Sequence, residues 1–149
     1  FLDSDSRAES LPSSLSPTAV TNIQTARKNH PDHCKSSSTT IIVDCDAATG
    51  KSSCAFNFSP CITRSRHLGH WILSQNRRMN ITELQRLQGI DPTQIVSVTA
   101  ESEFGKQIGN AMSMNVIERI LRSALLSSNL HLGGTLRDRW SDGTAYETL

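Results

Sequence analysis

The stretch that decides the fold is RRMNITELQRLQGI, residues 77–90. Asn80 followed three residues later by Glu83 is a capping-box pattern, in which each side chain accepts a hydrogen bond from the backbone N–H of the other residue. Apolar residues continue the helical spacing, and Gly89 suits the left-handed turn that commonly ends a helix. We therefore predict a short helix over about residues 81–88.

A second and longer helix is predicted from Ser113, directly after GKQIGNAM, residues 105–112. Six apolar residues recur there at spacings of three and four and so fall on one face: Val116, Ile117, Ile120, Leu121, Ala124 and Leu125. Charged residues lie off that face: Glu118, Arg119 and Arg122. Burying four such aliphatic side chains is worth roughly 6–10 kcal/mol before entropy is counted. We therefore expect the apolar stripe to be buried against another surface.

The residues upstream of these helices predict short strands. TTIIV, residues 39–43, is a β-branched run typical of a buried strand, and a polar turn follows over residues 44–53. Two further short strands are expected around residues 61–63 and 70–73.

Both ends of the chain predict little regular structure. Residues 1–39 are rich in Ser, Thr, Asn and Asp and lack periodicity, so they are predicted to be a disordered or linker-like segment. The Gly133-Gly134 pair and the polar residues around it predict a flexible C-terminal tail over residues 129–149. Because Phe1 stands where an initiator methionine is expected, we expect that upstream sequence is missing or has been removed.

Three segments resemble the cytosine-5 DNA methyltransferase family. Residues 77–90 resemble its ninth motif, typically Arg-Arg-Leu-Thr-Pro-Arg-Glu followed by Arg-Leu-Gln-Gly-Phe. Residues 105–112 resemble its tenth motif, which usually ends Gln-Ile-Gly-Asn-Ala-Val. SPCITRSR and GHW, residues 59–66 and 69–71, are similar to the Pro-Thr-Leu-Thr segment that leaves the target-recognition region. The resemblance covers roughly residues 40–128.

The resemblance implies an α/β fold: the C-terminal portion of a Rossmann-like methyltransferase domain, with short strands from the target-recognition region followed by helices. Residues 40–76 would end the recognition region, and residues 77–128 would complete the methyltransferase domain. The implied cofactor is S-adenosyl-L-methionine, with cofactor contacts at Asn110 and Ala111. Gly109 would permit close backbone approach. The alternative role for Asn110 is an N-terminal helix cap.

A basic strip between residues 61 and 88 suits a nucleic-acid partner. It holds five arginines against the single acid Glu83, and arginine forks match phosphate oxygens and guanine edges. Ordinary solvated surface is the alternative interpretation. The resemblance implies that the partner is DNA, with RNA left open. The predicted DNA-contact residues are Arg64, Arg66, Arg77 and Arg78.

The catalytic motifs of the family have no match in the chain. There is no glycine-rich cofactor loop, no Glu-Asn-Val triplet and no Gln-x-Arg-x-Arg element. Pro60-Cys61 lacks a partner that would activate a thiolate, so Cys61 is predicted to be a half-buried residue at a strand start. We therefore predict no catalytic residue here.

Methyl transfer from S-adenosyl-L-methionine to carbon 5 of cytosine would belong to a parent enzyme, whose missing N-terminal part is the expected partner. The alternative is a non-catalytic nucleic-acid-binding remnant.

Other classes of function are less well supported. IIVDCDAATGKS, residues 41–52, imitates the phosphate loop of nucleotide hydrolases, but Cys45 replaces the first glycine and no helix is predicted after it. The four cysteines are irregularly spaced, and His30 and His33 beside Cys34 lack paired ligands, so we expect reduced thiols and no metal. No apolar run approaches the roughly 18 residues that a membrane span needs. We expect an intracellular protein, nuclear if its source is eukaryotic.

Overall fold

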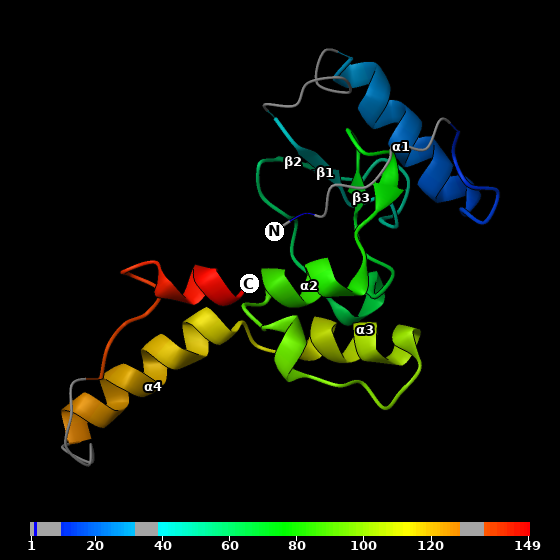
Figure 1. The fold of residues 1–149 in the computed structure, drawn as a ribbon. Coiled ribbons are helices and arrows are strands. Elements are labelled where there is room, and N and C mark those ends of the chain that lie inside the picture. The colour runs from blue at the N-terminus through cyan, green and yellow to red at the C-terminus, as the bar shows by residue number, and fades with distance from the viewer. Residues whose placement is uncertain (1, 3–9, 32–38, 129–135) are drawn as a thin grey trace.

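The structure, a computed structural model, describes residue 2 and residues 10–31, 39–128 and 136–149 (Figure 1). Its strands are β1 (Ile41–Val43), β2 (Cys54–Phe56), β3 (Trp71–Ile72) and β4 (Arg77–Arg78). Its α-helices are α1 (Pro17–Asn29), α2 (Ile81–Leu87), α3 (Glu101–Asn110) and α4 (Met114–Ser128). Three short 3-10 helices complete the described elements: η2 (Arg64–Arg66), η3 (Pro92–Gln94) and η4 (Thr144–Thr148).

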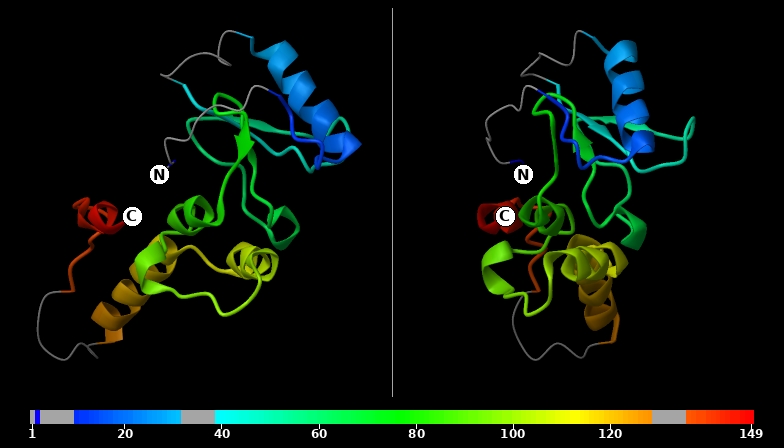
Figure 2. Two further views of the ribbon diagram at one scale, coloured as in Figure 1. Left: turned by 45° about the vertical axis from the view of Figure 1, so that its right-hand side comes forward. Right: turned by 90° about the vertical axis from the view of Figure 1, so that its right-hand side faces the viewer.

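The four strands form one antiparallel sheet in the order β2-β1-β3-β4. Val43 of the central strand β1 pairs with Cys54 on one side and with Trp71 on the other. Successive side chains of a strand point to opposite faces, so Ile41 packs with α1 while Ile42 packs with α2 and α3. The buried strand predicted at residues 39–43 is confirmed. Its uninterrupted apolar run follows from the cover on both faces, which the two views of Figure 2 make visible.

The first part of the chain contains a packed helix, so the prediction of a disordered or linker-like segment over residues 1–39 is wrong for α1. The Ser16 hydroxyl caps this helix by accepting a hydrogen bond from the backbone N–H of Ala19 at 3.1 Å. Three small or apolar residues reach the core: Ala19, Ile23 and Ala26. The other positions of α1 are mostly polar, which hides the periodicity. Residues 3–9 and 32–38 lie outside the described part of the chain.

The helix predicted at residues 81–88 is confirmed as α2. Asn80 Oδ1 accepts from the Glu83 N–H at 2.8 Å, and Glu83 Oε2 accepts from the Asn80 N–H at 2.9 Å, which completes the capping box. Gly89 follows with φ of +73°. The capping pair and the glycine therefore set the two ends of this helix, as the sequence indicates.

The strand predictions are confirmed in part. β3 lies within the segment predicted at residues 70–73. Residues 61–63 form an unpaired coil that leads into η2, so the strand predicted there is wrong. β2, which was not predicted, pairs with β1 directly after the polar turn at residues 44–53. β4 begins at Arg77 and pairs with β3, so the ninth-motif segment starts inside the sheet.

The helix predicted after Ser113 is confirmed as α4, but its apolar stripe is exposed rather than buried. Val116, Ile120 and Leu121 have 51%, 58% and 55% of their surface accessible. In Figure 1 this helix extends away from the sheet and from α3. The expected burial is absent because no described segment covers that face.

The C-terminal residues are packed, so the prediction of a flexible tail over residues 129–149 is wrong for its described part. Trp140 is 7% exposed and Ala145 is 1% exposed. η4 follows a left-handed turn at Gly143, where φ is +86°. Residues 129–135 lie outside the described residues.

The described residues thus combine helices with a small antiparallel sheet, which agrees with the predicted α/β class at that level. α3 was not predicted, because Gly105 and Gly109 interrupt its apolar pattern. Among the described helices, none has the length and apolar character that crossing a membrane requires.

Candidate functional site

Two glycines bring α3 onto the backbone of the η2 segment. A Cβ atom at Gly109 would lie 2.4 Å from the carbonyl carbon and oxygen of Thr63, and one at Gly105 would lie 2.5 Å from the carbonyl oxygen of His67. Residues four positions apart lie on the same face of a helix, so both glycines pack against the backbone of the segment from Thr63 to His67. Contact at this distance requires residues without a side chain. The close approach at Gly109 is to the protein's own backbone at Thr63, and the predicted approach to the cofactor stays a prediction.

An open hollow of about 620 Å³ lies beside this contact. Its walls come from the η2 segment and from α3: Thr63, Arg64, Ser65, His67, Lys106, Gly109 and Asn110. No aspartate or glutamate lines it, although Glu103 pairs with Lys106 next to it. The Arg64 guanidinium makes no ion pair or hydrogen bond with any described residue. The hollow therefore presents positive charge, hydroxyl groups and one side-chain amide, which suits an anionic ligand.

Only one of the four arginines predicted to contact DNA lines this hollow. Arg64 does, whereas Arg66 Nε donates to Asp44 Oδ1 at 2.6 Å. Arg78 is held by Asp46 through two hydrogen bonds of 2.8 Å and also donates to the Gly69 carbonyl oxygen. Sequence reasoning missed these pairs because their members stand 22 and 32 residues apart. It also missed His67 and Lys106, which only folding brings beside Arg64.

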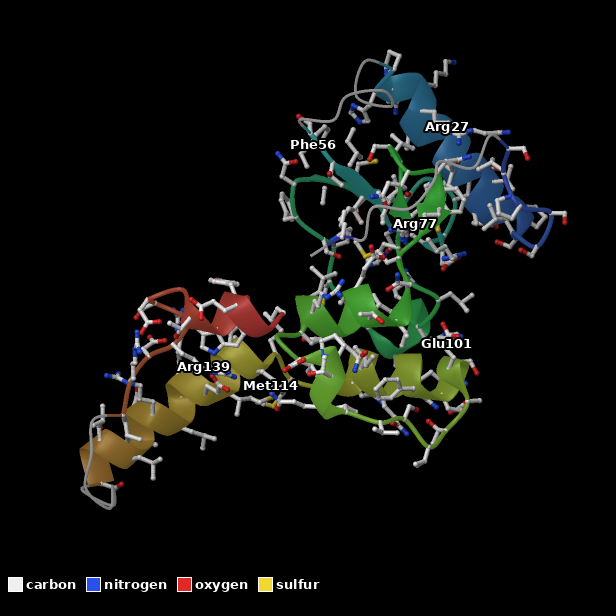
Figure 3. The ribbon with its side chains drawn as sticks, in the orientation of Figure 1. Arg27, Phe56, Arg77, Glu101, Met114 and Arg139 are labelled. Carbon is white, nitrogen blue, oxygen red and sulfur yellow. The ribbon has the colours of Figure 1, made fainter. Side chains whose placement is uncertain are left out.

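Arg77 is bound to a buried carboxylate. Its Nη1 and Nη2 atoms donate to the two Glu83 oxygens at 2.8 Å each, and the Glu83 side chain is fully buried. The same carboxylate accepts from the Asn80 N–H, so it joins the end of β4 to the first turn of α2. In Figure 3 Arg77 lies between the sheet and α2. Removing one partner of such a pair typically costs about 3–5 kcal/mol, which gives Arg77 a structural task at this position.

A buried histidine fixes the loop that leads into η2. His70 is 1% exposed, and its Nε2 lies 3.3 Å from the Cys61 carbonyl oxygen while its Nδ1 lies 3.8 Å from Asp44 Oδ1. Burial lowers the pKa of His70, although Asp44 and the backbone contact oppose this. A neutral imidazole therefore donates from Nε2 to the carbonyl and holds residues 61–70 as a loop.

The two residues predicted to contact cofactor lie where α3 ends. Asn110 is the last residue of the helix and lines the 620 Å³ hollow. Ala111 is the C-cap and lines a second hollow of about 350 Å³, together with Cys61, Gln88 and Ser113. The alternative role of Asn110 as an N-terminal cap is wrong, because the first turn of α4 is bonded to the Ser113 carbonyl oxygen.

Three other sequence features have no catalytic or ligand geometry. Cys61 is exposed, lies outside any strand and makes a weak 3.7 Å contact to the Ile62 carbonyl oxygen, so it is not the half-buried strand residue that was predicted. The turn that imitates a phosphate loop leads into β2 instead of a helix. No group of three or more metal-ligating side chains occurs among the described residues. His33 and Cys34 lie outside them.

Comparison with known proteins gives one match. The sequence model of the family described as C-5 cytosine-specific DNA methylase matches residues 8–125, well over half of the chain. The match begins before α1, upstream of the residues on which the motif resemblance rests. No curated protein and no solved structure matches the chain.

Replacing Gly109 with alanine tests the contact between α3 and η2. Alanine normally favours a helix interior over glycine by about 0.5–1 kcal/mol, but its Cβ would overlap the Thr63 carbonyl group. We expect Gly109→Ala to lower the free energy of unfolding in urea by about 1–3 kcal/mol. Gln107→Ala, at an exposed position of the same helix, is the control and should change it little. A Gly109→Ala variant as stable as the original chain would contradict the packing described.

Proposed function

The chain belongs to the C-5 cytosine-specific DNA methylase family, and from this premise we propose that it supplies the C-terminal part of a DNA (cytosine-5-)-methyltransferase. In this proposal the chain binds and orients DNA and one edge of the cofactor, while the bond-making residues lie elsewhere in the enzyme. The observation that carries the proposal is the packing of α3, from the segment that resembles the tenth motif, on the η2 segment that resembles the exit of the recognition region.

The packing of the helices supports a scaffolding role. Leu84 of α2 and Ile108 of α3 share one buried cluster with Ile42 and Ile72 of the sheet. The ninth and tenth motifs would thereby hold the end of the recognition region at a fixed position. The exposed apolar face of α4 would pack on the N-terminal part of a Rossmann-like domain and so complete that domain. A contiguous apolar face is seldom left exposed to solvent.

The basic hollow is the proposed DNA-contact site. Arg64 is free to bind a phosphate oxygen, and His67 adds a ring nitrogen from the same segment, while Lys106 lines the hollow from α3 in its pair with Glu103. Thr63 and Ser65 contribute hydroxyl groups from the same loop. Arg66, Arg77 and Arg78 are engaged by carboxylates, so in this proposal they position the loop and the helix without touching DNA themselves.

Asn110 and Ala111 fit one edge of a site for S-adenosyl-L-methionine, and no more of it. The Asn110 side-chain amide makes no hydrogen bond to the described residues and lies at the C-terminal end of α3. S-adenosyl-L-methionine, when bound, supplies the methyl group. This chain would contribute the Asn110 amide and the turn at Ala111 as orienting contacts.

The chain alone should not transfer methyl groups. Cys61 is an exposed thiol that directly follows Pro60, yet no acid or base among the described residues is placed to activate it. We expect no incorporation of labelled methyl from S-adenosyl-L-methionine into a cytosine-containing duplex by the purified 149-residue chain. Incorporation above a no-protein control would show that the chemistry resides here and would overturn this part of the proposal.

Arg64→Ala tests the DNA-contact site. One phosphate contact contributes a slope of about 0.9 when log affinity is plotted against log salt, so the variant should lower the slope of duplex binding by about one and leave the melting temperature unchanged. The control is Arg137→Ala, which removes an exposed arginine that pairs with Asp142 in the C-terminal segment. Equal slopes for Arg64→Ala and the original chain would place the DNA contact elsewhere.

DNA binding without any methyl transfer by a complete parent enzyme would favour the alternative of a non-catalytic nucleic-acid-binding remnant. Tighter binding of RNA than of duplex DNA to the same hollow would redirect the proposal to an RNA substrate. A nuclear location, in a eukaryotic source, would agree with a chromosomal substrate.

A further inference from the structure

The C-terminal segment lies along one side of α4, outside the region that the family model matches. The segment runs antiparallel to the helix. Arg122 Nε donates to the Leu136 carbonyl oxygen at 2.6 Å, and Arg119 Nε lies 3.2 Å from Asp138 Oδ2. Glu118 follows with contacts to the next two residues of the segment. We call residues 136–149 the strap. Figure 1 shows it returning beside α4 towards α2.

Glu118 makes the most contacts with the strap. Its carboxylate accepts two hydrogen bonds from Arg139, at 2.9 and 2.5 Å, and one from Trp140 Nε1 at 2.5 Å. Arg139 holds the pKa of Glu118 below its ordinary value, with Trp140 acting in the same direction and partial burial and Asp138 opposing them. A carboxylate with three donors has little capacity left for other ligands, so its role is to hold these two residues.

Trp140 anchors the strap to the ninth-motif turn. A Cβ atom at Gly89 would lie 2.7 Å from Cη2 of the indole, so the ring rests directly on that glycine. Tyr146 packs edge-on against the indole with ring centroids 5.8 Å apart, and the Arg139 guanidinium lies 5.4 Å from the ring centroid. Figure 3 shows Arg139 close to the N-terminal half of α4. The Trp140 side chain therefore joins the strap to the turn after α2, through Gly89, and to α4, through Glu118.

The strap contacts α4 along one side of the helix. At 100° per residue, Glu118, Arg119 and Arg122 share one side of the helix, and all three contact the strap. The exposed apolar residues Val116 and Ile120 lie on the far side, whereas Leu121 and Leu125, which are also exposed, lie next to Glu118. Because three charged side chains on one side of α4 are bound to the strap, the helix is held against rotation about its own axis. Val116 and Ile120 therefore stay turned away from the strap.

We propose that residues 136–149 are a conformational strap that closes on Glu118 and Gly89, fixes the rotation of α4 and keeps Val116 and Ile120 turned outward. The device does not depend on the function proposed above, because every contact that carries it lies within this chain. Opening the strap would loosen α4 without disturbing the sheet, since α1 and β1 to β4 make none of these contacts.

Hydrogen–deuterium exchange of the full 149-residue chain tests the strap. Glu118→Gln loses the ion pair with Arg139, and loss of a charge-assisted hydrogen bond corresponds to about tenfold faster exchange through local opening. We expect that acceleration in peptides covering residues 115–127 and 138–147, with unchanged exchange in the sheet. Glu147→Gln is the matched control, since it makes the same charge change in the strap at an exposed residue.

Trp140→Phe removes the hydrogen bond to Glu118 together with Cη2 and Cζ2, the two indole atoms that lie against Gly89. Because both anchors of the ring are lost, it should accelerate exchange in the same two segments at least as much as Glu118→Gln does. Exchange in α4 as slow in Glu118→Gln as in the original chain would overturn the proposal. Acceleration spread equally over the sheet would also overturn it, because it would show that Glu118 supports the whole fold and not a local strap.

Discussion

Direct contact between α3 and the backbone of the η2 segment is the constraint on which the rest of the site depends. Gly105 and Gly109 leave no side chain between the helix and the carbonyl groups of Thr63 and His67. This contact brings Lys106 and Asn110 of α3 into one hollow with Arg64 and His67 of the η2 segment. A β-carbon at either glycine would push the helix away and separate the two walls.

Charge pairing then decides which basic residues remain available. Arginines are numerous in residues 61–88, but carboxylates of the sheet turn and of α2 hold Arg66, Arg77 and Arg78. The pair of Arg77 with the buried Glu83 is the most demanding of these, because an unpaired buried carboxylate is costly. Arg64 is left facing solvent beside the α3 contact. The positive character of the site thus comes from one loop and one helix, not from the basic strip as a whole.

The parts of the fold that the sequence could predict rest on local patterns. The capping pair Asn80 and Glu83 and the β-branched run of β1 are legible from neighbouring residues alone. α1 was missed because only a few of its positions are apolar, and its Asn22 bonds to carbonyl oxygens of the turn after β1, a contact that no local rule predicts. The hollow could not be predicted for the same reason, since His67 and Lys106 meet only through the glycine contact. The exposed stripe of α4 shows the opposite error, in which a correct helix prediction was given a burial that this chain does not supply.

The chain belongs to the C-5 cytosine-specific DNA methylase family, and in the function proposed above these local features hold DNA against a domain that carries the chemistry. The most direct test of that account is a heteronuclear NMR titration of the 149-residue chain with a short DNA duplex. The account predicts that the largest amide shift changes fall on residues 63–67 and 105–110, with little change in α1. Largest changes in α1 or the sheet, or no change at any duplex concentration, would contradict it.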